Sequence, residues 1–79
     1  MPRFHFNIHD GVSLPDRRGT DLPGLHEAQV EALRLAGDLL RDGATRRRLG
    51  QDWRMEVTDE VGTPLFRLDL TVADAARLR

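Results

Sequence analysis

The fold is decided by residues 53–70, WRMEVTDEVGTPLFRLDL, which hold two alternating segments around a turn. Apolar and polar residues alternate from Trp53 to Thr58 and again from about Pro64 to Leu70. Such period-two alternation is typical of strands buried on one face. Residues 59–62, Asp-Glu-Val-Gly, have the composition of a hairpin turn, in which Gly62 supplies the positive backbone angle. The stretch therefore predicts an antiparallel hairpin.

The N-terminal part repeats this pattern. Residues 3–9 alternate, and Asp10-Gly11 is a favoured turn pair, so Val12 to Leu14 is expected to return as a short second strand. Pro15 limits its length. Residues 16–24 contain two arginines, two glycines and Pro23, which favours an irregular loop that leads to a helix.

A helix is expected from about Pro23 or Leu25 to Asp42, with Asp21 as its cap and Gly43 as its stop. At about 100° per residue its apolar residues gather on one side and its charged residues opposite. The small side chains of Ala28, Ala32 and Ala36 allow the helix to lie close against a sheet.

The predicted fold class is α+β, with the order β-β-α-β-β, an antiparallel sheet and one main helix packed on one face. Thr71 and Asp74 resemble a capping box, which allows one or two helical turns over Val72–Leu78. The whole chain, residues 1–79, is taken as a single small domain. The sheet face under the helix is expected to hold nine apolar residues: Phe4, Phe6, Ile8, Trp53, Met55, Val57, Phe66, Leu68 and Leu70.

Length and composition narrow the possible functions. Seventy-nine residues provide a thin core and disfavour a deep enclosed cavity. Twelve basic and thirteen acidic residues give a net charge of −1, so no overall charge favours nucleic acid or an anionic membrane. The apolar runs are too short for a secretory signal or a bilayer span, which favours a cytoplasmic location and no membrane association.

Catalytic and metal-binding patterns are weak. The chain has no cysteine and no lysine, which excludes thiol chemistry, Walker-type phosphate loops and Schiff bases. His5 and His9 share a strand face about 13 Å apart, too far for one metal ion. A Ser13-His9-Asp10 grouping has no evident oxyanion hole. We therefore expect no enzyme activity, no metal and no cofactor.

Several motifs resemble those of one family. They are Met1-Pro2-Arg3-Phe4 with Phe6, His9-Asp10-Gly11, Asp16, Gly19, Leu22-Pro23, Glu31-Ala32, and residues 53–60, WRMEVTDE, with Gly62. Together they resemble a bacterial family of short proteins catalogued as a domain of unknown function. The resemblance covers nearly the whole chain and implies no activity, cofactor or catalytic residue.

Two function classes remain. The first is a noncatalytic module that binds another protein or a second copy of itself through an edge strand or through the polar sheet face, whose candidate residues are Arg3, His5, Asn7, His9, Arg54, Glu56 and Arg67, together with Thr58 and Asp69. Homodimerisation fits this class because a small sheet has open edges. The alternative is weak nucleic-acid binding through the arginine loop of Arg46, Arg47 and Arg48.

Overall fold

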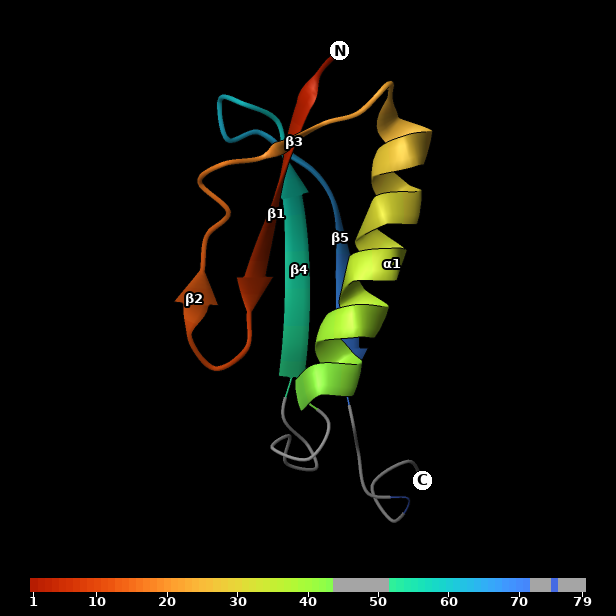
Figure 1. Cartoon of the computed structure of the whole chain (residues 1–79). Helices are drawn as coiled ribbons and strands as arrows, with labels where there is room; N and C mark the ends of the chain where they lie inside the picture. Colours follow the sequence, from red (N-terminus) through yellow and green to blue (C-terminus); the bar gives the residue numbers. More distant parts are fainter. Residues whose placement is uncertain (44–51, 72–74, 76–79) are drawn as a thin grey trace.

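A computed structural model covers the whole chain, and residues 1–43, 52–71 and 75 are described here. The structure is α+β, as predicted: an antiparallel sheet with one helix against it (Figure 1). Its elements are β1 (Arg3–His9), β2 (Ser13–Leu14), β3 (Thr20–Asp21), α1 (Leu25–Gly43), β4 (Asp52–Thr58) and β5 (Pro64–Thr71).

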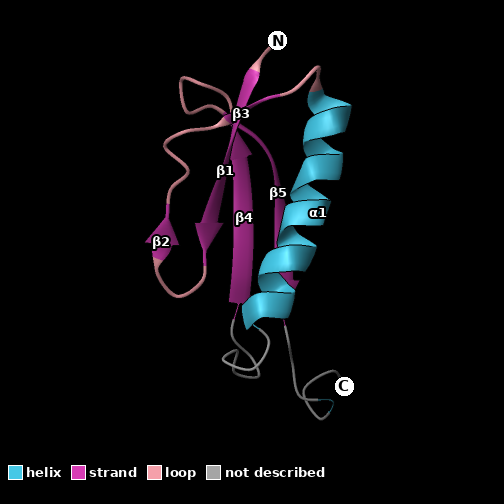
Figure 2. Ribbon diagram, in the orientation of Figure 1, coloured by secondary structure: helices cyan, strands magenta, loops and turns pink. Residues whose placement is uncertain are grey.

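The sheet has the strand order β2-β1-β4-β5, and β3 pairs with the start of β1 whereas β2 pairs with its end (Figure 2). The predicted C-terminal hairpin is confirmed, because β4 pairs with β5 from Asp52↔Thr71 to Thr58↔Pro64. Asp59 builds its turn: one carboxylate oxygen accepts hydrogen bonds from the backbone N–H groups of Val61 and Thr63. Gly62 has the expected positive φ of 88°. β1 and β4 lie at the centre of the sheet. Their pairing connects the N-terminal strands to the C-terminal hairpin.

The segment before the helix differs from the prediction. Residues 16–24 were expected to be irregular, but Thr20 and Asp21 form β3, which pairs with Phe4 and Arg3. Asp21 as the helix cap was therefore wrong, because its carboxylate faces Arg3. The carbonyl of Gly24 accepts the first helical hydrogen bond, from the N–H of Ala28.

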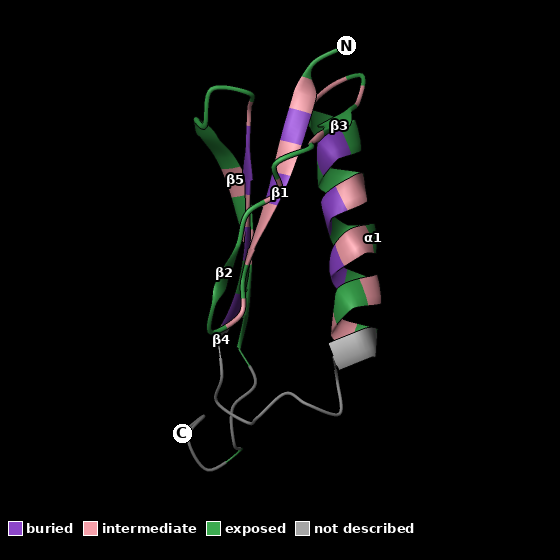
Figure 3. Ribbon diagram, turned by 60° about the vertical axis from the view of Figure 1, so that its left-hand side comes forward, coloured by how far each residue is buried: buried purple, intermediate pink, exposed green. Residues whose placement is uncertain are grey.

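The core is thickest over β1 and β4. Eight apolar residues are buried, and the alanine stripe of α1 is among them, as predicted (Figure 3): Phe4, Phe6, Ala28, Ala32, Ala36, Trp53, Met55 and Val57. Ile8, Phe66 and Leu68 are partly buried against this cluster. Leu70 is 36% exposed, so its prediction as a core residue was wrong. The inner face of β5 is therefore less completely covered than that of β4.

Two further expectations concern the C-terminal helical turns and membrane-spanning helices. The predicted helical turns over Val72–Leu78 lie outside them except at Ala75. In the part of the chain that is described, no helix has both the length and the apolar character that a bilayer span requires.

Candidate interaction surface

The sheet register brings the predicted polar residues together on the face opposite α1. His9 lies opposite Arg54, which lies opposite Asp69. One step along the strands, Asn7 lies opposite Glu56, and Glu56 lies opposite Arg67. Directly opposite residues of antiparallel strands project to the same face. Two rows of polar side chains therefore cross β1, β4 and β5.

Part of this face is occupied by the chain's own loop. The N–H of Asp16 donates to Oδ1 of Asn7 at 2.8 Å, and Nδ2 of Asn7 donates to the carbonyl of Glu56 at 3.2 Å. Nδ1 of His5 donates to the carbonyl of Asp16 at 2.7 Å. His5 and Asn7 are half-buried as a result. These two predicted surface residues fasten the loop of residues 15–19 to the sheet.

Asp16 fills a gap in the outer edge of β1. β2 pairs with Ile8 and His9, and β3 pairs with Arg3 and Phe4, which leaves Phe6 between them. The Asp16 carboxylate accepts the N–H of Phe6 and the N–H of Gly19, each at 3.0 Å. A side chain thus replaces the strand that would otherwise bond to the middle of this edge.

These contacts stabilise the ionised form of the Asp16 carboxyl group. Burial raises the pKa of the carboxyl, but hydrogen bonds from the backbone N–H groups of Phe6, Gly19 and Arg18 and the nearby charge of His5 outweigh burial. The pKa of Asp16 therefore lies below its ordinary value. The sequence motifs contained Asp16 and Gly19 but did not reveal this role, because it depends on contact with a strand ten residues away.

Arg3 completes the loop attachment. Its guanidinium donates to the carbonyl of Arg18 at 2.6 Å, and its Nε lies 3.1 Å from the carboxylate of Asp21. Gly19 lies between Arg3 and His5 with a positive φ of 74°. A Cβ there would stand 2.8 Å from both Cγ of Arg3 and Cε1 of His5. Arg3 therefore fastens the loop of residues 15–19 to this end of the candidate surface.

The remaining polar residues form a more open patch over β4 and β5. His9, Arg54, Arg67 and Asp69 are exposed and Glu56 is half-buried. Nε of Arg67 donates to the carboxylate of Asp69 at 2.9 Å. We call Arg54, Glu56, Arg67 and Asp69 the charged patch. It carries two positive and two negative side chains, so it suits a partner of mixed charge rather than a polyanion.

The two edges of the sheet differ in how they are covered. The outer edge of β1 is covered by β2, β3 and Asp16. On the other side the strand order ends at β5, and within the described residues no strand pairs with its outer edge. A strand as long as β5, with residues 64–70 along an edge that no described strand covers, can accept a strand from another chain.

The other sites considered from the sequence are the Ser13-His9-Asp10 grouping, a metal site and the arginine loop. Ser13 lies opposite His9 in register, but no hydrogen bond joins their side chains. Among the residues described, no three metal-ligating side chains come together. Arg46, Arg47 and Arg48 lie outside the described residues.

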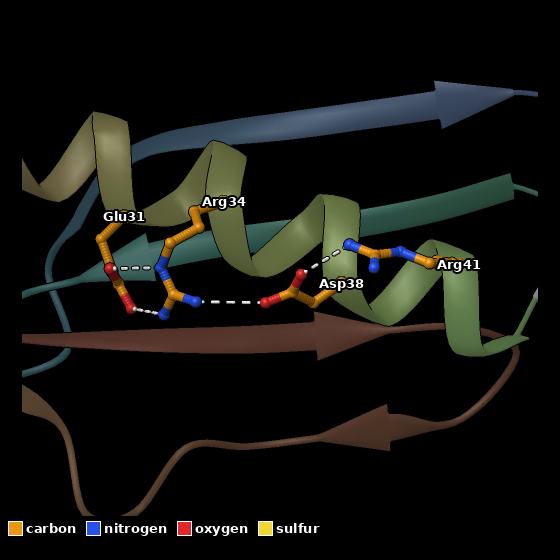
Figure 4. A network of polar contacts seen from close by, with 4 residues as sticks. All are labelled: Glu31, Arg34, Asp38 and Arg41. Atoms are coloured by element: carbon orange, nitrogen blue, oxygen red, sulfur yellow. Dashed lines mark hydrogen bonds and ion pairs between the residues drawn. The ribbon is translucent and has the colours of Figure 1, made fainter.

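The outer side of α1 carries a separate ion network. Arg34 bridges Glu31 at 2.6 Å and Asp38 at 3.1 Å, and Arg41 contacts Asp38 at 3.0 Å (Figure 4). The hydrogen bond from Arg34, against a smaller effect of burial, lowers the pKa of Glu31. The network runs along the flank of α1 that is turned toward β1 rather than β5 (Figure 4). Its spacing of three and four residues is that of pairs which stabilise a helix surface, so it needs no ligand to explain it.

Comparison with known proteins agrees with the resemblance seen in the motifs. No curated protein and no solved structure matches the chain. A family profile matches residues 3–71, a range that includes every strand described above. The chain therefore belongs to the family described as Domain of unknown function (DUF6894).

Proposed function

We propose that this protein is a noncatalytic interaction module that associates with a protein chain, its own second copy included, by strand addition at the open edge of β5. We propose that it acts in the cytoplasm. The observation that carries the proposal is the contrast between the two sides of the sheet. One side is closed by two short strands and a carboxylate, and on the other no described strand pairs with the outer edge of β5 over residues 64–70.

The physical basis is backbone hydrogen bonding. An edge strand presents a row of N–H and C=O groups that lack a partner strand, and another extended segment satisfies them without any change of fold. Natural edge strands are often protected by charged side chains, by proline or by a covering loop. The two charges of β5, Arg67 and Asp69, are of opposite sign and pair with each other, and its proline stands at its first residue, Pro64.

The charged patch adds specificity to this edge. Arg67 and Asp69 belong to β5 itself, with side chains 58% and 56% exposed. An incoming strand places its own side chains directly beside them, so opposite charges are favoured and like charges are disfavoured. The patch therefore selects which segment binds, while the backbone supplies the common part of the affinity.

The proposal also accounts for the absence of a reactive constellation in the described residues. Nδ1 of His5 donates to the carbonyl of Asp16, and His9 and Ser13 are linked by strand pairing rather than by a hydrogen bond between their side chains. The exposed charged patch and the outer edge of β5 are features that another protein chain can bind.

Amide hydrogen exchange measured by NMR at increasing protein concentration tests the proposal. Backbone N–H groups of β5 that point away from β4 are expected to exchange fast in dilute protein and to slow at high concentration. Amides of β4, which are paired on both sides, serve as the internal control. Outward amides of β5 that stay unprotected up to millimolar protein, with a solution mass of 9.0 kDa throughout, contradict strand addition between copies of this chain.

A further inference from the structure

We propose that the occupant of the β5 edge is a second copy of this chain, bound antiparallel about a two-fold axis that passes beside Leu68. This inference rests on the proposed function and adds the partner and the register. It follows from the order of residues along β5, Pro-Leu-Phe-Arg-Leu-Asp-Leu-Thr.

The register is self-complementary. When two β5 strands run antiparallel with Leu68 opposite Leu68 of the partner subunit, Arg67 lies opposite the partner's Asp69. By symmetry Asp69 lies opposite the partner's Arg67. On the other face, Phe66 meets the partner's Leu70. One register thus forms two opposite-charge pairs on the polar face and three apolar pairs on the helix face, which are the pairings that stabilise adjacent strands.

Neighbouring registers lack this match. A shift that keeps both helices on the same face moves the centre by one residue, and it then places Arg67 against Arg67 or Asp69 against Asp69 at the axis. Like charges directly opposite are destabilising. Registers centred between two residues put charged side chains beside apolar ones, because successive residues of a strand point to opposite faces. The charge order therefore selects the register centred on Leu68.

The second strand of each copy extends the pattern. Glu56 lies opposite Arg67, and Arg54 lies opposite Asp69, within one chain. In the dimer a row across four strands reads Glu56, Arg67, the partner's Asp69, the partner's Arg54. Signs alternate along that row and along its symmetry mate. The candidate residues Arg54, Glu56 and Arg67 thus all belong to these rows of alternating charge.

The apolar side fits the same arrangement. Phe66 and Leu68 are only partly buried, and Leu70 is 36% exposed. On α1, Leu33 is 63% exposed. Two helical positions span about 200°, so Leu33 points nearly opposite to Glu31, whose network faces β1. Leu33 therefore stands on the β5 side of the helix, toward the second copy.

The assembly closes at two chains. A β5–β5 contact is isologous, so each copy uses its own open edge and none is left over. The far edges of the joined sheet are those of β2 and β3, which are two residues long each and flank Asp16 along β1. Neither repeats the β5 contact, so this contact alone does not build a filament.

Single-cysteine variants read the register directly, because the natural chain contains no cysteine. Leu68→Cys places two thiols opposite each other across the axis, where strand spacing of ~4.5–5.5 Å between Cα atoms permits a disulfide. In Leu70→Cys, the matched control on the same face, the thiols are four residues apart in register, about 13 Å. In a redox buffer Leu68→Cys is expected to give a covalent dimer and Leu70→Cys a monomer. Equal cross-linking of the two variants overturns the register.

Charge reversal tests the same register without touching the apolar face. Arg67→Asp and Asp69→Arg each replace two attractive pairs by repulsive ones, and each is expected to weaken self-association roughly 10-fold or more in sedimentation. The double variant R67D/D69R restores both opposite-charge pairs between the two copies, and so does an equimolar mixture of the two single variants; the pairs with Glu56 and Arg54 inside each chain are not restored, so self-association is expected to recover relative to the single variants. Single reversals that dimerise as the natural chain does overturn the inference.

The two proposals fail differently. If β5 amides gain protection with concentration while Leu68→Cys stays monomeric and the reversals have no effect, this register is wrong and strand addition stands. If the amides never gain protection, a second copy is not the occupant of the β5 edge and this inference is wrong, while strand addition by a different protein chain is left standing.

Discussion

Replacement of Gly19 by alanine is the sharpest test of the loop attachment. Gly19 has a φ of +74°, a conformation that costs a residue with a Cβ roughly 1–2 kcal/mol. The added Cβ also stands 2.8 Å from side-chain atoms of both Arg3 and His5, closer than two carbons can lie. Both side chains must therefore move away.

The displaced side chains carry the bonds that hold the loop. Arg3 donates to the carbonyl of Arg18, and His5 donates to the carbonyl of Asp16. Each such bond contributes about 0.5–1.5 kcal/mol net. Added to the backbone cost, Gly19→Ala is expected to lower the free energy of unfolding by roughly 2–5 kcal/mol, a large share of the ~5–15 kcal/mol of a typical domain.

Gly62→Ala is the matched control. Gly62 also has a positive φ, +88°, but no atom lies within 4 Å of its added Cβ. It is expected to lose only the backbone cost of roughly 1–2 kcal/mol. Urea unfolding followed by the fluorescence of Trp53, the single tryptophan, which is 2% exposed, gives both values. If the two variants lose the same free energy within about 0.5 kcal/mol, Gly19 does not lie against Arg3 and His5, and the loop attachment is wrong.

Three further predictions concern the loop, the core and the helix. Asp16→Ala is expected to lower stability by roughly 2 kcal/mol, because the backbone N–H groups that it accepts lose a charged acceptor. The folded pKa of Asp16 lies below its ordinary value of 3.8, so its contribution is complete above that pH and is lost as the pH falls through the folded value; urea midpoints from pH 3 to 7 should show less acid loss in Asp16→Ala than in the natural chain. Phe6→Ala, at a buried position, is expected to cost ~3–5 kcal/mol and the half-open Leu70→Ala only about 1–2 kcal/mol, and equal losses in the same assay would argue against the core described here. Gly37→Ala is expected to raise stability by about 0.5–1 kcal/mol, since Gly37 lies within α1 with open space around it, and a lower thermal midpoint would contradict that placement.

Much of the fold could be predicted from local patterns. Alternation located β1, β4 and β5, and the spacing of Ala28, Ala32 and Ala36 identified the buried side of α1. These patterns are readable because each side chain's exposure follows directly from the period of its own element. The polar face was predicted for the same reason, and the register confirms that its residues share one side of the sheet.

The use of that face could not be predicted from local patterns. Arg3, His5 and Asn7 look like surface residues in an alternating strand, yet they hold the loop of residues 15–19. Asp21 looks like a helix cap, yet it pairs with Arg3. In each case a partner far along the chain decides the role, and periodicity contains no information about that partner.

By itself, the sequence determined which faces are apolar and which are charged, because that depends only on residue order and on the repeat of a strand or a helix. It also contains the Arg67-Leu68-Asp69 order on which a self-complementary register depends. Only the tertiary structure decided that, among the described residues, the outer edge of β5 rather than that of β1 lacks a neighbouring strand, since strand order and the bond from Phe6 N–H to the Asp16 carboxylate arise from long-range hydrogen bonds.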